Sequence, residues 1–159
     1  MKIKMKKILL ILSFLRNTPE SASEAINIAK QNRAELVVLF VLDIEFAENI
    51  VNKLTDEGWI GGKPSEQLYM SLLREYKFQS EARTSEIEEQ AKKEDVKVRS
   101  IIKSGAILEQ TLKIVTLENP DLIFISRRKR SSLSRLIFGS LANALQKRVR
   151  CEVRIIDSE

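Results

Sequence analysis

Three continuous apolar runs constrain the fold of this chain more than any other feature. They are residues 7–13 (KILLILS), 36–42 (LVVLFVL) and 121–126 (DLIFIS). A strand with one wet face alternates apolar and polar residues, whereas a strand buried on both faces is apolar throughout. The runs therefore predict the central strands of a parallel sheet that helices cover on both sides.

Helix signals separate the apolar runs. Thr18-Pro19-Glu20 predicts a helix start, with Thr18 as the cap and Pro19 in the first turn. A second helix is expected from Pro64 to about Glu94, and Asn119-Pro120 ends a third that follows Gly105. The other predicted elements are a short helix near 46–54, an edge strand at 96–102, a helix at 139–148 and a strand at 151–157. We expect an α/β fold: one domain, residues 1–159, with a single doubly wound five-stranded parallel sheet.

The composition lowers the expectation of catalysis. The 159 residues include no histidine, which removes the usual general base near neutral pH and the commonest metal ligand. The single cysteine, Cys151, excludes an intrachain disulfide and a thiolate zinc cluster. We expect Cys151 to be a buried structural residue; the alternative is a thiol that Arg150 activates.

Positive charge is concentrated near the C-terminus. The formal net charge is +5, and residues 120–159 contain nine Lys or Arg against four Asp or Glu. Four consecutive bases, Arg127 to Arg130, follow the third apolar run, and we expect them in a basic loop between a strand and a helix. A strand end that faces a helix start favours bound anions.

The segment from Asp121 to Ser140 (DLIFISRRKRSSLSRLIFGS) resembles the universal stress protein family. In that family, a G-x-x-G-x9-G-[S/T] pattern after the fourth strand holds nucleotide phosphates. Here Gly139-Ser140 matches its end, whereas Ser126 and Lys129 replace its first two glycines. In nucleotide-binding members an aspartate ends the first strand, and Ser13 occupies that position here. The resemblance covers nearly the whole chain and implies the strand order 3-2-1-4-5.

The resemblance implies a degenerate site for ATP or AMP at the switch point of the sheet. Arg127, Lys129 and Arg130 would supply side-chain charge where backbone donors are lost, and Val41 matches the position that meets the base. The alternative is that the site is lost and the fold serves as a dimeric scaffold. The candidate nucleotide-binding residues are Ser13, Val41, Ser126, Arg127, Lys129, Arg130, Gly139, Ser140 and Leu141.

The resemblance also implies a homodimer that pairs through the last strand. That strand lies at an edge of the sheet, where unpaired backbone groups invite a partner. Val153 and Ile155 would then lie on one face, and Arg154 and Ile156 on the other. The lead hypothesis is a cytoplasmic universal stress-like binding protein that is not an enzyme.

A weak ATP-hydrolysing or phosphotransfer enzyme is the alternative from another class. It needs a metal-binding carboxylate, and Asp43, after the second apolar run, is the only clear candidate. We favour Asp43 as a plain loop residue, and we expect no catalytic residue and no metal site.

Segment 44–78 corresponds to the family's variable region, with a mobile loop expected near 57–64, where three of the five residues 58–62 are glycine. Trp59 in that loop either covers a bound base or, as we favour, packs onto the domain. We expect no nucleic-acid partner for the basic run, because no DNA- or RNA-binding motif accompanies it. The lysine-rich N-terminus precedes an apolar run too short for a membrane span, so we expect no membrane partner.

Overall fold

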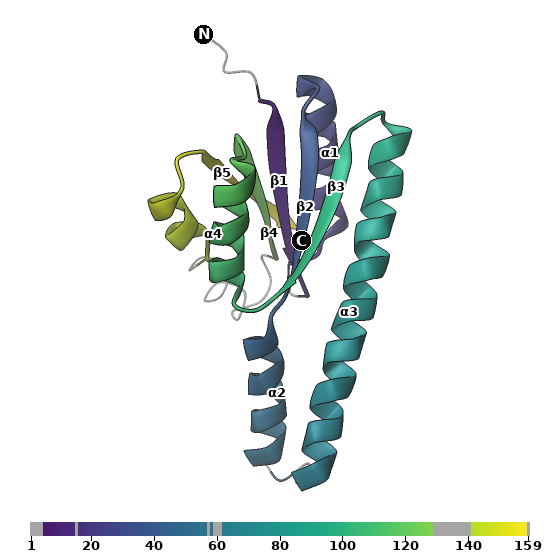
Figure 1. Cartoon of the computed structure of the whole chain (residues 1–159), viewed down its shortest axis with the longest axis vertical. Helices are drawn as coiled ribbons and strands as arrows, with labels where there is room; N and C mark the ends of the chain where they lie inside the picture. The colour runs from purple at the N-terminus through teal and green to yellow at the C-terminus, as the bar shows by residue number, and fades with distance from the viewer. Residues whose placement is uncertain (1–4, 15, 57, 59–61, 129–140, 159) are drawn as a thin grey trace.

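A computed structural model describes residues 5–14, 16–56, 58, 62–128 and 141–158. Its elements follow one another in the order β1 (Lys7–Ser13), α1 (Pro19–Asn32), β2 (Glu35–Leu42), α2 (Ile44–Asp56), α3 (Gly62–Lys93), β3 (Val98–Ser104), α4 (Ile107–Glu118), β4 (Leu122–Arg128) and β5 (Glu152–Ser158). Residues 141–148 form a further helix between β4 and β5. The five strands make one parallel sheet in the order β3-β2-β1-β4-β5 (Figure 1), which confirms the predicted fold and strand order.

Side chains of the central strands alternate between two buried clusters. Ile8, Leu10 and Leu12 of β1 pack with α1 and α3 on one face, which we call the α1 face. Leu9 and Ile11 pack with α4 and the 141–148 helix on the other, the α4 face. Residues 8–12 are fully buried, so both faces of the sheet are covered, as the continuous apolar runs predict.

The predicted cap of α1 is confirmed. The Thr18 side chain accepts a hydrogen bond from the Ser21 N–H at 3.4 Å, and Pro19 is the first helical residue. Thr18 thereby satisfies one of the amide groups that lack an intrahelical partner at a helix start. The chain enters α1 directly after the carboxyl end of β1, which places this helix start near that edge of the sheet.

The expected start of β3 is wrong by two residues, because Val96 belongs to the end of α3. Asp95 adopts a left-handed conformation with φ 57°, and the Val96 N–H donates to the Ala91 carbonyl at 2.9 Å. This arrangement closes the last turn of a helix and buries the apolar residue that follows it. Val96 is therefore buried as a cap, and sheet pairing begins at Val98.

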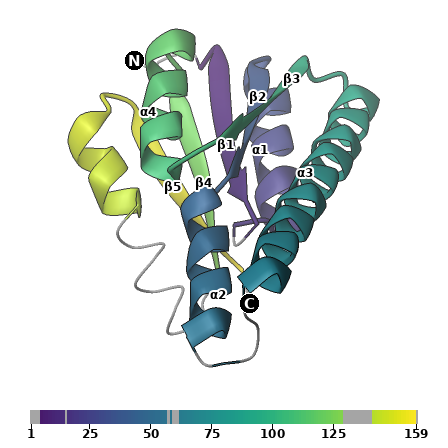
Figure 2. The ribbon, with the colours of Figure 1, turned by 60° about the horizontal axis from the view of Figure 1, so that its bottom comes forward.

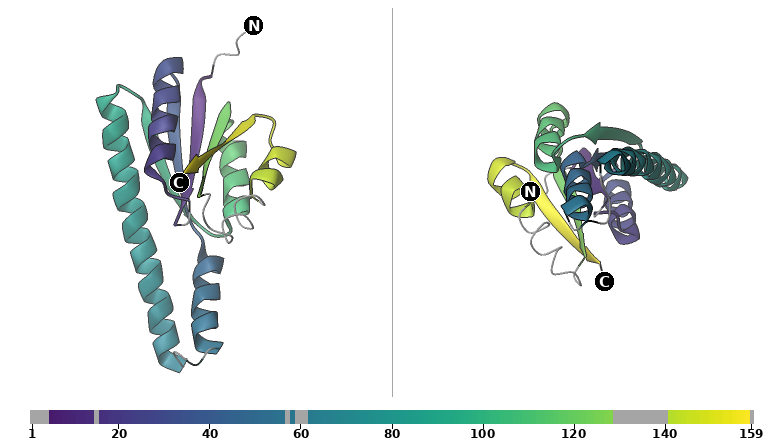
Figure 3. Two further views of the ribbon diagram at one scale, coloured as in Figure 1. Left: turned by 180° about the vertical axis from the view of Figure 1, so that it is seen from behind. Right: turned by 90° about the horizontal axis from the view of Figure 1, so that it is seen from below.

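The expected loop at 57–64 is also wrong at its end, because α3 begins at Gly62. The first amides of a helix have no intrahelical partner, so Gly62 and Pro64 are tolerated in the first turn. From there α3 runs for 32 residues, and its first half lies beside α2 beyond the carboxyl edge of the sheet (Figures 2 and 3). Among the described side chains of α3, the buried ones lie between Tyr76 and Ala91.

An ion-pair network closes the opposite, amino edge of the sheet. Glu35, the first residue of β2, accepts hydrogen bonds from Arg99 at 2.8 Å and pairs with Lys97 at 3.1 Å. Arg99 also contacts Glu118 at the end of α4. Burial alone would raise the pKa of Glu35, but the hydrogen bonds from Arg99 and Lys97 outweigh it, so the pKa lies below its usual value.

We expect Glu35→Gln to lower the free energy of unfolding at pH 7. A depressed carboxyl pKa stabilises the folded state above about pH 4.5, the ordinary value, and this contribution is lost as the pH falls through the folded pKa. Urea denaturation at pH 7 and at lower pH measures the free energy of unfolding. The difference in this free energy between wild type and variant should become smaller in acid. Glu89→Gln, at an exposed position on α3, is the control. A free-energy difference that does not change with pH would contradict the lowered pKa of Glu35.

Candidate functional site

The carboxyl edge of the sheet contains the topological switch point. The chain leaves β1 toward β2 on one side, whereas β4 leads to β5 on the other side. Helices and loops after two adjacent strands with diverging connections leave room between them, and open α/β sheets bind ligands there. Those sequence-predicted site residues that the structure describes lie at or near this edge.

Three of the predicted residues lie together on the α4 face. Ser13 pairs in register with Val41, and both are buried. Val41 and Leu141 belong to the cluster of the α4 face, and the alternation of β1 places Ser13 on that face after Leu9 and Ile11. Leu141 is the first described residue of the helix after β4. The structure therefore brings Ser13, Val41 and Leu141 to one side of the switch point.

Ser126 lies on the other side. In β4, Leu122 and Phe124 belong to the α1 face, and Ser126 follows them two residues later at the same alternation. Its side chain is fully buried, and its hydroxyl oxygen has no hydrogen-bond partner in the described part of the chain. The serine that replaces the first motif glycine therefore adds no side chain on the face of Ser13 and Val41.

The basic run begins inside a strand. β4 extends to Arg128, with Arg127 paired to Asp157 and Arg128 to Ser158 of β5. The expected basic loop is therefore wrong for its first two members, because pairing with β5 continues past Ser126. Both arginines still end β4 at the carboxyl edge, where the hypothesis requires them. Lys129, Arg130, Gly139 and Ser140 lie outside the described residues.

A buried arginine in the turn after β1 is a site feature that the sequence did not reveal. The Ser13 N–H donates to the Arg16 carbonyl at 3.2 Å, and the Arg16 N–H donates to the Ser13 carbonyl at 3.0 Å. These two bonds fold the turn back on the strand end, and Arg16 is only 3% exposed. Burial lowers the pKa of Arg16 to about 10, against the opposing effect of the Asp43 carboxylate. The guanidinium thus remains charged at neutral pH.

Asp43 follows β2 directly and interacts electrostatically with Arg16. It also acts on Tyr76 of α3, whose pKa is raised first by burial and then by the Asp43 charge. A carboxylate in the electrostatic field of a buried arginine attracts a further cation less strongly. Within the described ranges, no group of three potential metal ligands occurs.

An aromatic pair connects α3 to the turn after β1. The ring of Phe14 stacks on that of Tyr76, with 4.8 Å between centroids and an interplanar angle of 27°. Next to it, Arg83 of α3 donates to the Asn17 side chain at 2.8 Å and to the Thr18 carbonyl at 3.4 Å. The turn after β1 is therefore fixed by contacts from α3, and these contacts hold the edge of the site in place.

Cys151 and the glycine-rich loop around Trp59 are the remaining residues that the sequence singles out. Cys151 is half-buried just before β5, and burial raises the pKa of its thiol, which supports the structural role over the activated thiol. Gly58 lies in a turn with φ 78°, whereas Trp59 lies outside the described residues.

Among the described helices, none is long and apolar enough to cross a bilayer.

Comparison with known proteins identifies the family. A model of the universal stress protein family matches residues 4–157, so the chain belongs to this family. The Universal stress protein MJ0531 of Methanocaldococcus jannaschii is 24% identical over 137 residues, which are 86% of this chain and 73% of the relative.

Solved structures of the family share the fold. UspA from Lactobacillus plantarum superposes with a TM-score of 0.71 at 17% identity, over 98% of this chain and 99% of that one. A universal stress protein in complex with cAMP gives a TM-score of 0.64 at 13% identity, over 99% and 100% of the two chains. At such identities the likeness establishes the architecture alone.

We expect Ser126→Ala to raise the free energy of unfolding by about 1 kcal/mol, because it removes a buried hydroxyl that lacks a partner. Ser21→Ala is the matched control, since the Ser21 hydroxyl is equally buried but donates to the Thr18 carbonyl at 2.8 Å. That variant should lose about 1 kcal/mol. Chemical denaturation of both variants measures the difference, and a destabilised Ser126→Ala would contradict the assigned environment.

Proposed function

We propose that this universal stress protein is a cytoplasmic homodimer that binds an adenine nucleotide, AMP or ATP, at the carboxyl edge of its sheet. The phosphates would lie against the end of β4 and the residues after it, and the nucleoside against Ser13 and Val41. The site is degenerate, since Ser126, Lys129 and Ser13 replace residues of the family pattern. The protein acts by binding and carries out no reaction of its own.

One observation carries the nucleotide proposal. By the alternation of β4, Arg127 follows Ile123 and Ile125 on the α4 face, beside the strand end where Ser13, Val41 and Leu141 share that face. Cations next to an apolar face suit a ligand that combines a phosphate with a flat ring. The fully buried Ser126 side chain, on the α1 face, does not project toward this side. A family member solved with cAMP supports the same ligand class.

Two features support a role in binding over one in catalysis. The chain has no histidine, and Asp43, the carboxylate considered as a metal ligand, lies in the field of buried Arg16. Phosphoryl transfer relies on a metal ion near the phosphates, and Asp43 is poorly suited to hold one. Phosphate release from magnesium ATP by the purified protein would contradict this part of the proposal.

The dimer proposal rests on β5. Within the described residues, this strand pairs with β4 alone and forms one edge of the sheet. Val153 and Ile155 pack toward the α4 face, whereas Ile156 packs toward the α1 face. Arg154 lies 5.6 Å from the centre of the Phe124 ring and pairs with Glu152 at 2.7 Å. An edge strand whose side chains are half-buried on both faces and whose outer backbone groups are unpaired can accept a second strand by backbone hydrogen bonds.

Titration calorimetry with adenosine, AMP and ATP tests the ligand. Affinity should rise along this series, because each added phosphate meets the positive charge at the end of β4. Arg127→Glu should weaken ATP binding by roughly tenfold to a hundredfold, the usual loss for a charged hydrogen bond to phosphate. Lys77→Glu, an exposed charge reversal on α3, is the matched control.

The titration distinguishes two ways in which the nucleotide proposal can be wrong. If neither nucleotide produces heat at high protein concentration, the chain does not bind nucleotide. If adenosine binds as tightly as ATP, the base is recognised but the cations of β4 do not contact the ligand.

Light scattering over micromolar concentrations tests the dimer. We expect a mass of twice the 18.2 kDa of one chain. Pairing through backbone hydrogen bonds depends little on charge, so the mass should persist at high salt. A single species of one chain's mass throughout the range would contradict the dimer without affecting the nucleotide proposal.

A further inference from the structure

Arg16 is the one charged side chain that the structure buries among the residues it describes. It is 3% exposed, whereas every other Lys, Arg, Asp or Glu whose burial is described reaches solvent at least in part. Removing a guanidinium from water carries a cost that a single ion pair rarely exceeds in return. Stability alone therefore gives little reason for the burial of Arg16, and buried charge of this kind is found preferentially where proteins bind or react.

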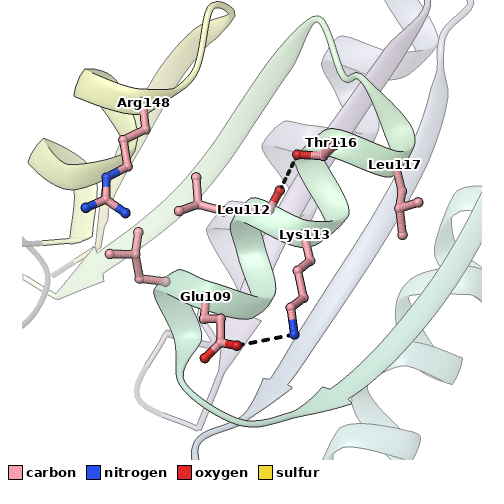
Figure 4. Close-up of a pocket in the computed structure, with 7 residues that line it drawn as sticks. Glu109, Leu112, Lys113, Thr116, Leu117 and Arg148 are labelled. Atoms are coloured by element: carbon pink, nitrogen blue, oxygen red, sulfur yellow. Dashed lines mark hydrogen bonds and ion pairs between the residues drawn. The ribbon is translucent and has the colours of Figure 1, made fainter.

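Two hollows on the surface of the described chain lack such a group. The hollow beside α4, of about 640 Å³, is lined by six residues of that helix and by Arg148 (Figure 4). The hollow at the amino edge, of about 630 Å³, is lined in part by Lys30 and Glu94, which pair at 2.6 Å. No polar side chain of either lining is buried, so water solvates their charges. Within the described residues, buried charge is thus confined to the carboxyl edge, where Arg16 lies.

The turn that contains Arg16 lies between the ends of β2 and β4. Backbone hydrogen bonds join Arg16 and Ser13 in both directions, at 3.2 and 3.0 Å. In the sheet, β1 has β2 on one side and β4 on the other. Since Ile11 pairs with Ile125, the continued register places Ser13 level with Arg127, one strand spacing of about 4.8 Å away. The turn therefore adjoins the strand end to which the phosphates are assigned.

Asp43 lies on the β2 side of this turn. It follows β2 directly, and Val41, two residues earlier, pairs with Ser13. The half-buried Asp43 carboxylate interacts electrostatically with Arg16 and offsets part of the cost of burying the guanidinium. Arg16 thus lies between a carboxylate on the β2 side and, on the β4 side, the place where a bound nucleotide would bring negative charge.

The hydroxyl of Tyr76 is a second group near Asp43. Tyr76 is 3% exposed, and its hydroxyl oxygen has no hydrogen-bond partner in the described part of the chain. It lies in the field of the Asp43 charge, and the stacked ring of Phe14, at 4.8 Å between centroids, holds it beside the same turn. A buried phenol hydroxyl ordinarily donates a hydrogen bond, and leaving it unpaired costs free energy. A carboxylate released by its arginine would supply the missing acceptor.

We propose that Arg16 is a further phosphate-binding residue of the nucleotide site, and that it exchanges Asp43 for the phosphates when nucleotide binds. The phosphates of ATP carry more negative charge than one carboxylate, so they attract the guanidinium more strongly. Tyr76 then donates to Asp43 in place of Arg16, because a buried carboxylate left without a partner would be costly. The inference rests on the proposed nucleotide site and adds to it a residue that the sequence did not predict.

Titration calorimetry of the full chain with ATP and with adenosine tests the exchange. Arg16→Met removes the charge but keeps most of the apolar volume, so ATP should bind about tenfold more weakly while adenosine binds as before. Asp43→Asn removes the competing anion, and ATP should bind several-fold more tightly. Arg74→Met, at an exposed position on α3, is the matched control and should leave both affinities unchanged.

Double variants separate the exchange from simple electrostatic repulsion. If Asp43 acts by holding Arg16, Asp43→Asn should strengthen ATP binding in the wild-type background but not in Arg16→Met. Tyr76→Phe keeps the stacked ring and removes the donor, so it should weaken ATP binding several-fold in the wild type and less in Asp43→Asn. Arg16→Met combined with Asp43→Asn leaves no buried charge unpaired. Its comparison with Asp43→Asn keeps the test valid even if Arg16→Met alone does not fold.

The titrations distinguish failure of this inference from failure of the nucleotide proposal. If the wild type binds neither ATP nor adenosine, both are wrong. If the wild type binds ATP and Arg16→Met binds it equally tightly, Arg16 does not contact the phosphates, and the nucleotide proposal is unaffected. A gain from Asp43→Asn that persists in Arg16→Met would also overturn the exchange, because Asp43 would then act on the ligand directly.

Discussion

Burial of β1 on both faces is the constraint on which the rest of the molecule depends. Five successive side chains, Ile8 to Leu12, are fully buried and alternate between two clusters. A strand of this kind requires a neighbour on each side and a layer of helices above and below. Polar function is thereby confined to the edges, and the carboxyl edge gathers Ser13, Arg16 and Asp43, whereas the amino edge is closed by the ion pairs of Glu35.

The sequence predicted those parts of the fold that depend on periodicity and local chemistry. Continuous apolar runs gave the central strands, and Thr18 with Pro19 gave the start of α1. Element boundaries were predicted wrongly where a left-handed backbone turn or a distant strand decides them. Val96 is apolar, which favours a strand, but its N–H caps the end of α3. Arg127 is charged, which favours a loop, but its backbone continues β4 in register with Asp157 of β5. No local pattern distinguishes these outcomes, because the competing interaction is made by a residue far along the chain or by a left-handed backbone turn.

The candidate site was predictable in position and only partly in composition. Parallel strand topology brings Ser13 beside Val41, and this register follows once the sheet is assumed. The face on which Ser126 lies also follows from alternation, but only after the strand is known to continue to Arg128. Arg16 could not be found in advance, since an arginine that ends an apolar run is ordinarily solvated and here is 3% exposed. Its burial depends on Asp43 and on the packing of α3 over the turn, neither of which is local in sequence.

The unequal support along α3 divides one continuous helix into two regions of different local stability. From Tyr76 onward, α3 contributes Tyr76, Ile87 and Ala91 to the cluster of the α1 face, so amide protons of this part should exchange slowly with solvent. Among the described side chains of α3, none before Tyr69 packs on that cluster. The start of α3 lies beside α2 past the sheet, so this part can fray while the core stays intact (Figure 1). Because Phe14 stacks on Tyr76, which follows these first core contacts, fraying of the start of α3 leaves the turn after β1 in its folded position. The aromatic pair thus connects the turn after β1 to the part of α3 that packs on the sheet.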